Sequence, residues 1–114
     1  MKYSTKLIFE YLQAKNPELL KIIQNAETEE DIKVIAHTFV YGDEINKFGE
    51  WAYEYSMKEH SLGLLLFTSE AINMAQSKYS GLKSYLLEDS PTIGEGVELL
   101  AIRCFQDIVK ELST

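Results

Sequence analysis

The chain has 114 residues, the length of one ordinary domain, and 46% of them are hydrophobic against 25% charged. These values are typical of a globular protein with its own core and exclude a largely disordered chain. Eighteen acidic against eleven basic residues give a formal net charge of −7 at pH 7. Because nucleic acid and anionic membranes repel such a chain, the charge argues against both as direct partners and favours a cationic one.

The cysteine content and the first residues indicate a cytoplasmic protein. Cys104 is the only cysteine, so no disulfide can form within the chain. The apolar residues 7–9 are too few for a signal peptide, and the apolar run 64–67 is too short for a membrane helix. We therefore expect a soluble, cytoplasmic protein without a membrane anchor.

Apolar residues recur at helical spacing from the first residues onward. The first predicted helix begins at Ser4 or Thr5, whose hydroxyl groups can cap it, and its apolar stripe is Leu7, Ile8, Tyr11 and Leu12. Asn16-Pro17 then indicates a break and a new start, because proline disfavours helix at the preceding residue and fits the first helical position. The stripe of the second helix is Leu19, Leu20, Ile22, Ile23 and Ala26.

Two further helices are predicted in the middle of the chain. Thr28 and Asp31 have the spacing of a capping box, and Gly42 stands where a C-terminal cap belongs. The helix between them buries Ile32, Ile35, Ala36 and Phe39. Asp43 is the expected cap of the next helix, whose inner side is Ile45, Phe48, Ala52 and Tyr55, with Trp51 at the border.

The remaining residues predict a long fifth helix and a last one. The fifth spans about 62–79, and its four consecutive apolar residues 64–67 predict a place at the centre of the fold. Ser80-Gly81 either ends this helix or bends it. Thr92 and Glu95 form a second capping box before an apolar stripe of Val97, Leu100, Ala101, Cys104, Phe105, Ile108 and Leu112. The expected fold is all-α, a compact single-domain bundle of five to seven helices over residues 1–114.

Motifs for metal chemistry are sparse. Neither His37 nor His60 follows a glutamate by three residues, as a di-iron bundle requires, and zinc-binding spacings are absent. The nearest candidate is similar to the magnesium sites of all-helical nucleotide pyrophosphohydrolases and combines Glu27, Glu30, Asp31, Glu95 and Glu98. Acids in the first turn of a helix are already explained by capping and by the helix dipole. We therefore expect no metal and no cofactor.

Nucleophilic and phosphotransfer chemistry has one candidate. Cys104 lies on an apolar stripe, where a thiol is usually a small core residue. The segment 36–39, Ala-His-Thr-Phe, resembles the start of the phosphorylated segment of histidine phosphotransfer domains, which would imply phosphorylation of His37. That family has lysine and then a small residue where this chain has Val40 and Tyr41. Gly94-Glu95-Gly96 lacks the strand and third glycine of a phosphate loop, and we expect it to be a flexible entry to the last helix.

The outer side of the fourth helix has the composition of a protein interface. Residues 27–59 carry nine acids and three lysines, a net of −6, so they hold most of the negative charge. Opposite the inner side, a tyrosine and a methionine stand among polar residues, as anchors do in protein interfaces. The predicted partner-binding residues are Asp43, Glu44, Asn46, Glu50, Tyr53, Glu54 and Met57.

In size, helix content and charge, the whole chain resembles the small acidic helical immunity proteins that neutralise nuclease toxins, including those of contact-dependent growth inhibition. The resemblance implies a bacterial antitoxin-like inhibitor, not an enzyme, that binds a cationic toxin domain by charge complementarity. The alternatives are a phosphotransfer domain using His37, a phage-type inhibitor of a host nucleic-acid enzyme, and a metal-dependent hydrolase.

Overall fold

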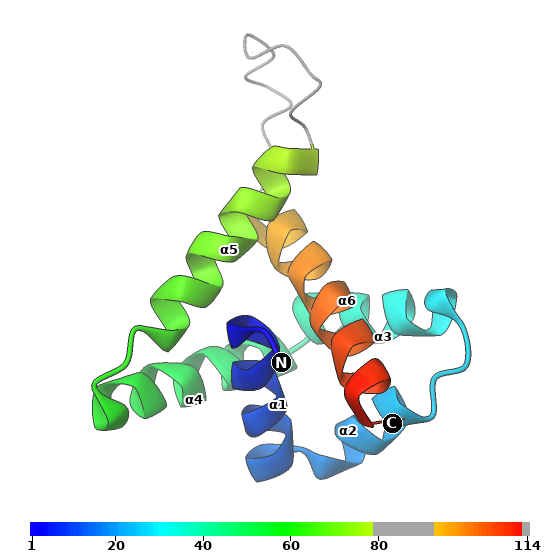
Figure 1. Cartoon of the computed structure of the whole chain (residues 1–114), viewed down its shortest axis with the longest axis horizontal. Helices are drawn as coiled ribbons and strands as arrows, with labels where there is room; N and C mark the ends of the chain where they lie inside the picture. The colour runs from blue at the N-terminus through cyan, green and yellow to red at the C-terminus, as the bar shows by residue number, and fades with distance from the viewer. Residues whose placement is uncertain (79–92, 113–114) are drawn as a thin grey trace, which may run out of the picture.

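The computed structural model describes residues 1–78 and 93–112, which form six α-helices (Figure 1). The helices are α1 (Tyr3–Lys15), α2 (Pro17–Gln24), α3 (Glu29–Tyr41), α4 (Glu44–Glu59), α5 (Gly63–Lys78) and α6 (Ile93–Leu112). No strand occurs in these two ranges. The predicted all-α class and number of helices are confirmed. None of the described helices combines the length and apolar character needed to cross a membrane.

One hydrophobic core joins all six helices, and aromatic rings make up its middle. The ring of Phe48 meets those of Tyr11 and Phe67 edge-on, with centroids 5.4 Å and 5.0 Å away. Phe39 meets Phe105 in the same way at 5.5 Å. Edge-to-face pairs are favourable because the positive ring edge points at a negative ring face. Rings from five different helices therefore fix the positions of those helices relative to one another.

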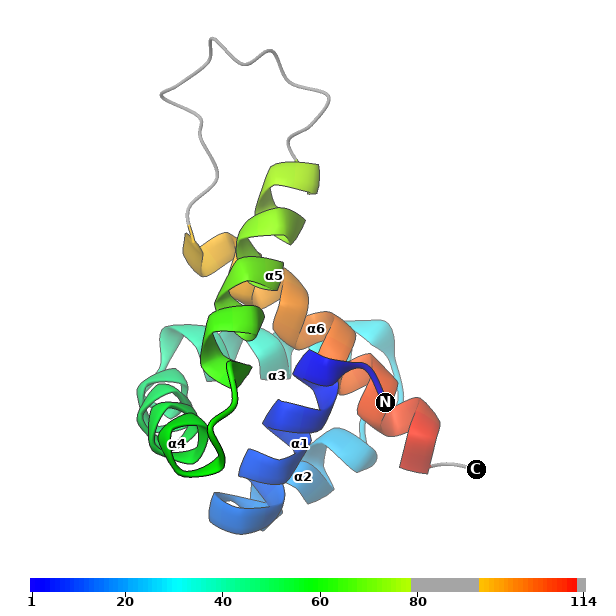
Figure 2. The same ribbon diagram turned by 60° about the vertical axis from the view of Figure 1, so that its left-hand side comes forward.

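The central helix is α6, and the expectation that the fifth helix lies at the centre is wrong. α6 packs against α1, α2, α3 and α5, as Figures 1 and 2 show. α5 buries only one row of side chains, Phe67, Ala71 and Ala75, whereas Leu65 and Leu66 are 61% and 46% exposed. Consecutive residues of a helix point about 100° apart, so a run of four apolar residues cannot all face one neighbour.

The capping box predicted at Thr28 is present, and Asn16, at the predicted restart, also caps its helix. The Asn16 side chain accepts a hydrogen bond from the backbone N–H of Leu19 at 3.1 Å. Thr28 and Asp31 form a complete capping box, in which each side chain accepts from the other residue's backbone N–H. Gly42 ends α3, and Asp43 precedes α4 but makes no capping hydrogen bond with its side chain, contrary to expectation. Ser80-Gly81 and Thr92 lie outside the described residues.

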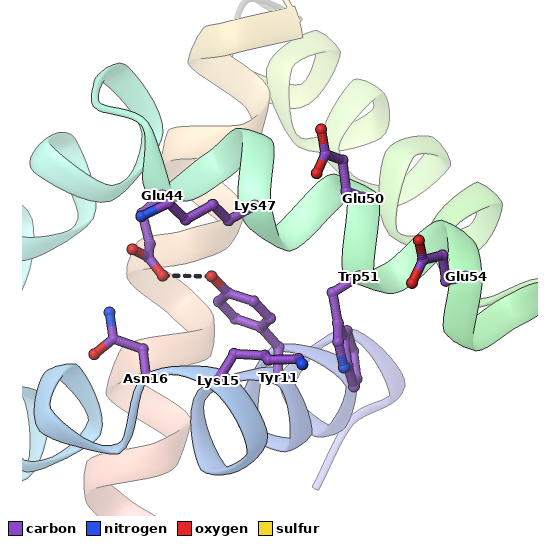
Figure 3. A pocket seen from close by; sticks show the side chains of 8 residues that line it. All are labelled: Tyr11, Lys15, Asn16, Glu44, Lys47, Glu50, Trp51 and Glu54. Carbon is purple, nitrogen blue, oxygen red and sulfur yellow. Dashed lines mark hydrogen bonds between the residues drawn. The ribbon is translucent and has the colours of Figure 1, made fainter.

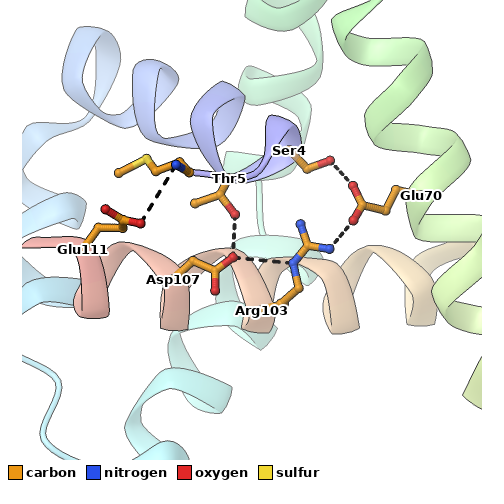
Figure 4. A network of polar contacts seen from close by, with 7 residues as sticks. Ser4, Thr5, Glu70, Arg103, Asp107 and Glu111 are labelled. Atoms are coloured by element: carbon orange, nitrogen blue, oxygen red, sulfur yellow. Dashed lines mark hydrogen bonds and ion pairs between the residues drawn. The ribbon is translucent and has the colours of Figure 1, made fainter.

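The sequence predicts that Ser4 or Thr5 caps α1, but neither does. Both residues lie buried within the first turn of this helix. The Ser4 hydroxyl donates to Glu70 of α5, and the Thr5 hydroxyl donates to Asp107 of α6 at 2.9 Å (Figure 4). Arg103 of α6 pairs with Glu70 and lies 3.6 Å from Asp107. This polar network connects the start of α1 to both α5 and α6.

Gly96 lets α5 and α6 approach closely. A Cβ atom added to Gly96 would lie 2.1 Å from the carbonyl oxygen of Ala71 and 3.0 Å from the Cβ of Ala75. Gly94 and Gly96 both lie in the first turn of α6, which agrees with their predicted place at the entry to the last helix. Glycine is present here because the backbone of α5 occupies the place of a side chain.

Candidate protein-binding face

α4 places its predicted inner side on the core. Phe48 and Ala52 are buried, and Ile45 and Tyr55 are half-buried. Trp51 is also half-buried, which agrees with its predicted place at the border. The period of apolar residues therefore gives the correct orientation of this helix.

Six of the seven residues predicted to bind a partner are exposed, one directly before α4 and five on its outer side. They are Asp43, Asn46, Glu50, Tyr53, Glu54 and Met57. Tyr53 and Met57 are 59% and 64% exposed, far more than large side chains that serve a core. Within the described part of the chain, no hydrogen bond or ion pair engages Glu50 or Glu54. Both carboxylates are thus available to a cation from outside.

The seventh predicted residue, Glu44, has a structural contact instead. It is half-buried and accepts a hydrogen bond from the hydroxyl of Tyr11 in α1 (Figure 3). Burial of the phenol raises the pKa of Tyr11 far above its usual value, and the Glu44 carboxylate adds to this by opposing a second negative charge. Tyr11 therefore stays protonated as the donor that ties α4 to α1.

Two adjoining hollows run between the C-terminal end of α1 and α4, and we call them the α1–α4 groove. The first, of about 500 Å³, is lined by Tyr11, Lys15, Asn16, Glu44, Lys47, Glu50, Trp51 and Glu54 (Figure 3). The second, of about 610 Å³, is lined by Lys15, Trp51, Tyr53, Glu54, Tyr55, Met57 and Lys58. Sequence reasoning missed the α1 side of this groove.

The wall of the α1–α4 groove is aromatic. The Trp51 ring stacks on Tyr55 with centroids 4.9 Å apart and planes at 21°, and it meets Tyr11 edge-on at 5.6 Å. Lysines stand beside the acids along the groove, namely Lys15, Lys47 and Lys58. Charges of both signs therefore line the groove, with Glu50 and Glu54 beside these lysines. Aromatic rings and charged side chains thus occur together on this surface, as they do in protein interfaces.

His37 of α3 forms a hydrogen bond with α6. Its Nδ1 atom lies 2.8 Å from a carboxylate oxygen of Glu98 in α6, and its side chain is 65% exposed. The Tyr41 ring lies against the imidazole, with centroids 4.6 Å apart. A phosphotransfer domain keeps a small residue at that position to leave room for the phosphoryl group. Tyr41 removes that room.

The five acids considered for a metal site do not come together. The Asp31 carboxylate accepts hydrogen bonds from the backbone N–H groups of Glu27 and Thr28, which occupies it in capping. Glu27 lies near Gln106, whereas Glu98 lies eight residues earlier on α6, about 12 Å along the helix axis. Across the described ranges, no three potential metal-ligating side chains form a group.

Cys104 is a core residue, as predicted. Its side chain is fully buried between α6 and its neighbours, and burial raises the pKa of the thiol to about 11. A thiol that stays protonated is a poor nucleophile.

Comparison with known proteins adds no further constraint on function. No family model, curated protein or solved structure matches the chain.

Proposed function

We propose that the protein is an immunity or antitoxin-like inhibitor that binds and neutralises a cationic toxin domain, such as a nuclease, in the bacterial cytoplasm. The observation that carries the proposal is the set of exposed side chains on the outer side of α4. There two unpaired carboxylates, Glu50 and Glu54, flank Tyr53 and Met57, which are both more than half exposed. A phage-type inhibitor of a nucleic-acid enzyme would use the same surface on a different partner.

The acids and the apolar residues of this surface have different roles in the proposal. Exposed charges act over a distance of about 10 Å at moderate salt, so Glu50 and Glu54 accelerate the encounter with a basic domain. Tyr53 and Met57 lose water when the partner closes on them, so they slow dissociation. The carboxylates of Glu50 and Glu54 also compete with the phosphates of the nucleic acid that a nuclease would bind.

The test is to measure association and dissociation separately for variants of each kind. The double variant Glu50→Lys/Glu54→Lys changes the net charge from −7 to −3. We expect it to slow association with the cationic toxin domain that the proposal requires, most strongly at low salt. We expect Tyr53→Ala to accelerate dissociation and to weaken binding by about 2 kcal/mol.

Matched controls separate this surface from general effects of charge and size. Glu27→Lys/Glu29→Lys makes the same charge change at the start of α3, and Val34→Ala trims another exposed apolar residue. Both controls should bind nearly as the unmodified chain does, and thermal melts of all variants should show that each is folded. Equal binding by the α4 variants and the unmodified chain would contradict the proposal.

A further inference from the structure

The outer side of α5 carries no charge. Between Ser61 and Ser77, Glu70 is the only charged residue. Its carboxylate points inward, where it accepts hydrogen bonds from Ser4 and Arg103 (Figure 4). In a chain in which one residue in four is charged, four turns of uncharged helix surface are unusual.

The same side of α5 exposes a row of apolar residues. Leu62, directly before the helix, and Leu65, Leu66 and Ile72 within it are 62%, 61%, 46% and 40% exposed. Steps of three and four residues connect them through Ser69, which places them on one side of the helix together with the exposed polar residues Ser69, Asn73 and Gln76. We call these seven residues the α5 outer face. In Figure 1 this helix forms an edge of the bundle, because α1, α4 and α6 pack against its other side.

We propose that the α5 outer face binds the same face of a second copy of this chain. A two-fold symmetric interface must be complementary to itself, so a charged residue near its centre would meet its own like charge. The α5 outer face meets this requirement because it has no charge. Two chains of net charge −7 repel each other when acidic surfaces meet, and pairing through α5 avoids this.

The spacing of the face fits the packing of two helices. Ser69 lies in the middle, with Leu65 and Leu66 toward one end and Ile72 toward the other. Steps of three and four residues are those of a helix pair in which side chains of one helix insert between those of the other. The small Ser69 side chain lets the two backbones come close at the point where the helices cross.

The size of the face sets the expected strength of the dimer. Its four apolar side chains expose on the order of 400 Å² of apolar surface to solvent, which is the size of the largest apolar patch on a typical monomer. A standard interface takes about 800 Å² from each partner, so these side chains supply about half. We expect a reversible dimer with a dissociation constant of micromolar order. The α4 surface lies on a different helix, so this inference does not depend on the proposed function.

The first experiment measures the mass of the whole chain in solution. Sedimentation velocity at concentrations from about 1 to 200 µM, a range centred on the expected constant, should show a shift from monomer to dimer. Leu66→Glu places a negative charge opposite a second copy and should leave a monomer throughout. Val34→Glu makes the same change at an exposed residue of α3 and should dimerise as the unmodified chain does.

The second experiment locates the interface without disturbing the fold. Ser69 is exposed, and in either orientation of the helix pair it lies near its own copy, so Ser69→Cys should form a disulfide between two chains on mild oxidation. The buried Cys104 should not react, and Ala14→Cys, exposed on α1, is the matched control. A monomer at every concentration, a dimer that Leu66→Glu leaves intact, or equal cross-linking through positions 69 and 14 would each overturn the proposal.

Discussion

Replacement of Gly96 by alanine should destabilise the protein, although alanine is the better helix former. The added methyl group would have to occupy a place 2.1 Å from the carbonyl oxygen of Ala71, and this distance must widen to about 3.4 Å for ordinary contact. The obstacle is backbone and not a side chain that can rotate. α5 and α6 must therefore separate, and the burial of Ala71 and Ala75 decreases with them.

The magnitude follows from two opposing effects. Gly→Ala inside a helix stabilises it by about 1 kcal/mol, because glycine loses more backbone freedom on folding. Overpacking a tight contact costs about 1–3 kcal/mol and more where the backbone must move. Because a shift of a whole helix is needed, we expect Gly96→Ala to lower the free energy of unfolding by about 2 kcal/mol on balance. For a domain of this size, that corresponds to a drop in melting temperature of roughly 8 °C.

Gly49 provides the control. It lies inside α4, and an added Cβ would meet nothing within 4 Å. Gly49→Ala should therefore show the propensity gain alone and stabilise the protein by about 0.5–1 kcal/mol. Urea unfolding of both variants measures the change in the free energy of unfolding, which should be negative for Gly96→Ala and positive for Gly49→Ala. If Gly96→Ala were as stable as Gly49→Ala, the close approach of α5 and α6 at this position would be refuted.

Two further predictions concern the interior. Cys104 should resist a bulky thiol reagent until the protein unfolds, because it is buried and burial raises the pKa of its thiol to about 11. In the same urea assay, Cys104→Ala should lower the free energy of unfolding by about 1 kcal/mol. Rapid labelling of the folded chain would contradict the burial of this thiol. Burial raises the pKa of Glu70, but hydrogen bonds from Arg103 and Ser4 outweigh it and lower that pKa below the ordinary value of 4.5. The unfolded chain then takes up a proton first as the pH falls, so stability decreases below about pH 4.5. Glu70→Gln should be less stable at pH 7 and should lose less stability than the unmodified chain between pH 5 and pH 3; parallel pH profiles would exclude this role.

Local signals in the sequence are sufficient to predict most of the helices and the orientation of α4. Capping residues such as Asn16 and Thr28 act on backbone groups within three residues, so their effect is visible in the sequence. The burial of Phe48 and the exposure of Tyr53 follow from one helical period. The outer residues of the candidate site could therefore be named without a structure.

The rest depends on contacts between residues far apart in the chain. Ser4 has the composition of a cap, but its partner Glu70 is 66 residues away and draws it into the core. Tyr11 lines the α1–α4 groove and donates a hydrogen bond to Glu44, which no local pattern indicates. The inward side of α5 is set by close contact with Gly96, so a run of leucines alone predicted the wrong place for that helix.

The bond between Thr5 and Asp107 joins residues 102 positions apart, and this separation affects how the protein folds during synthesis. A ribosome adds about 5–20 residues per second, so α1 is made several seconds before α6. Until α6 has been made, Thr5 of α1 lacks its partner Asp107, and much of the core around Phe105 is missing. Nascent chains released before α6 should therefore expose α1 to proteases and chaperones, and the cooperative folding step should await the arrival of the last helix.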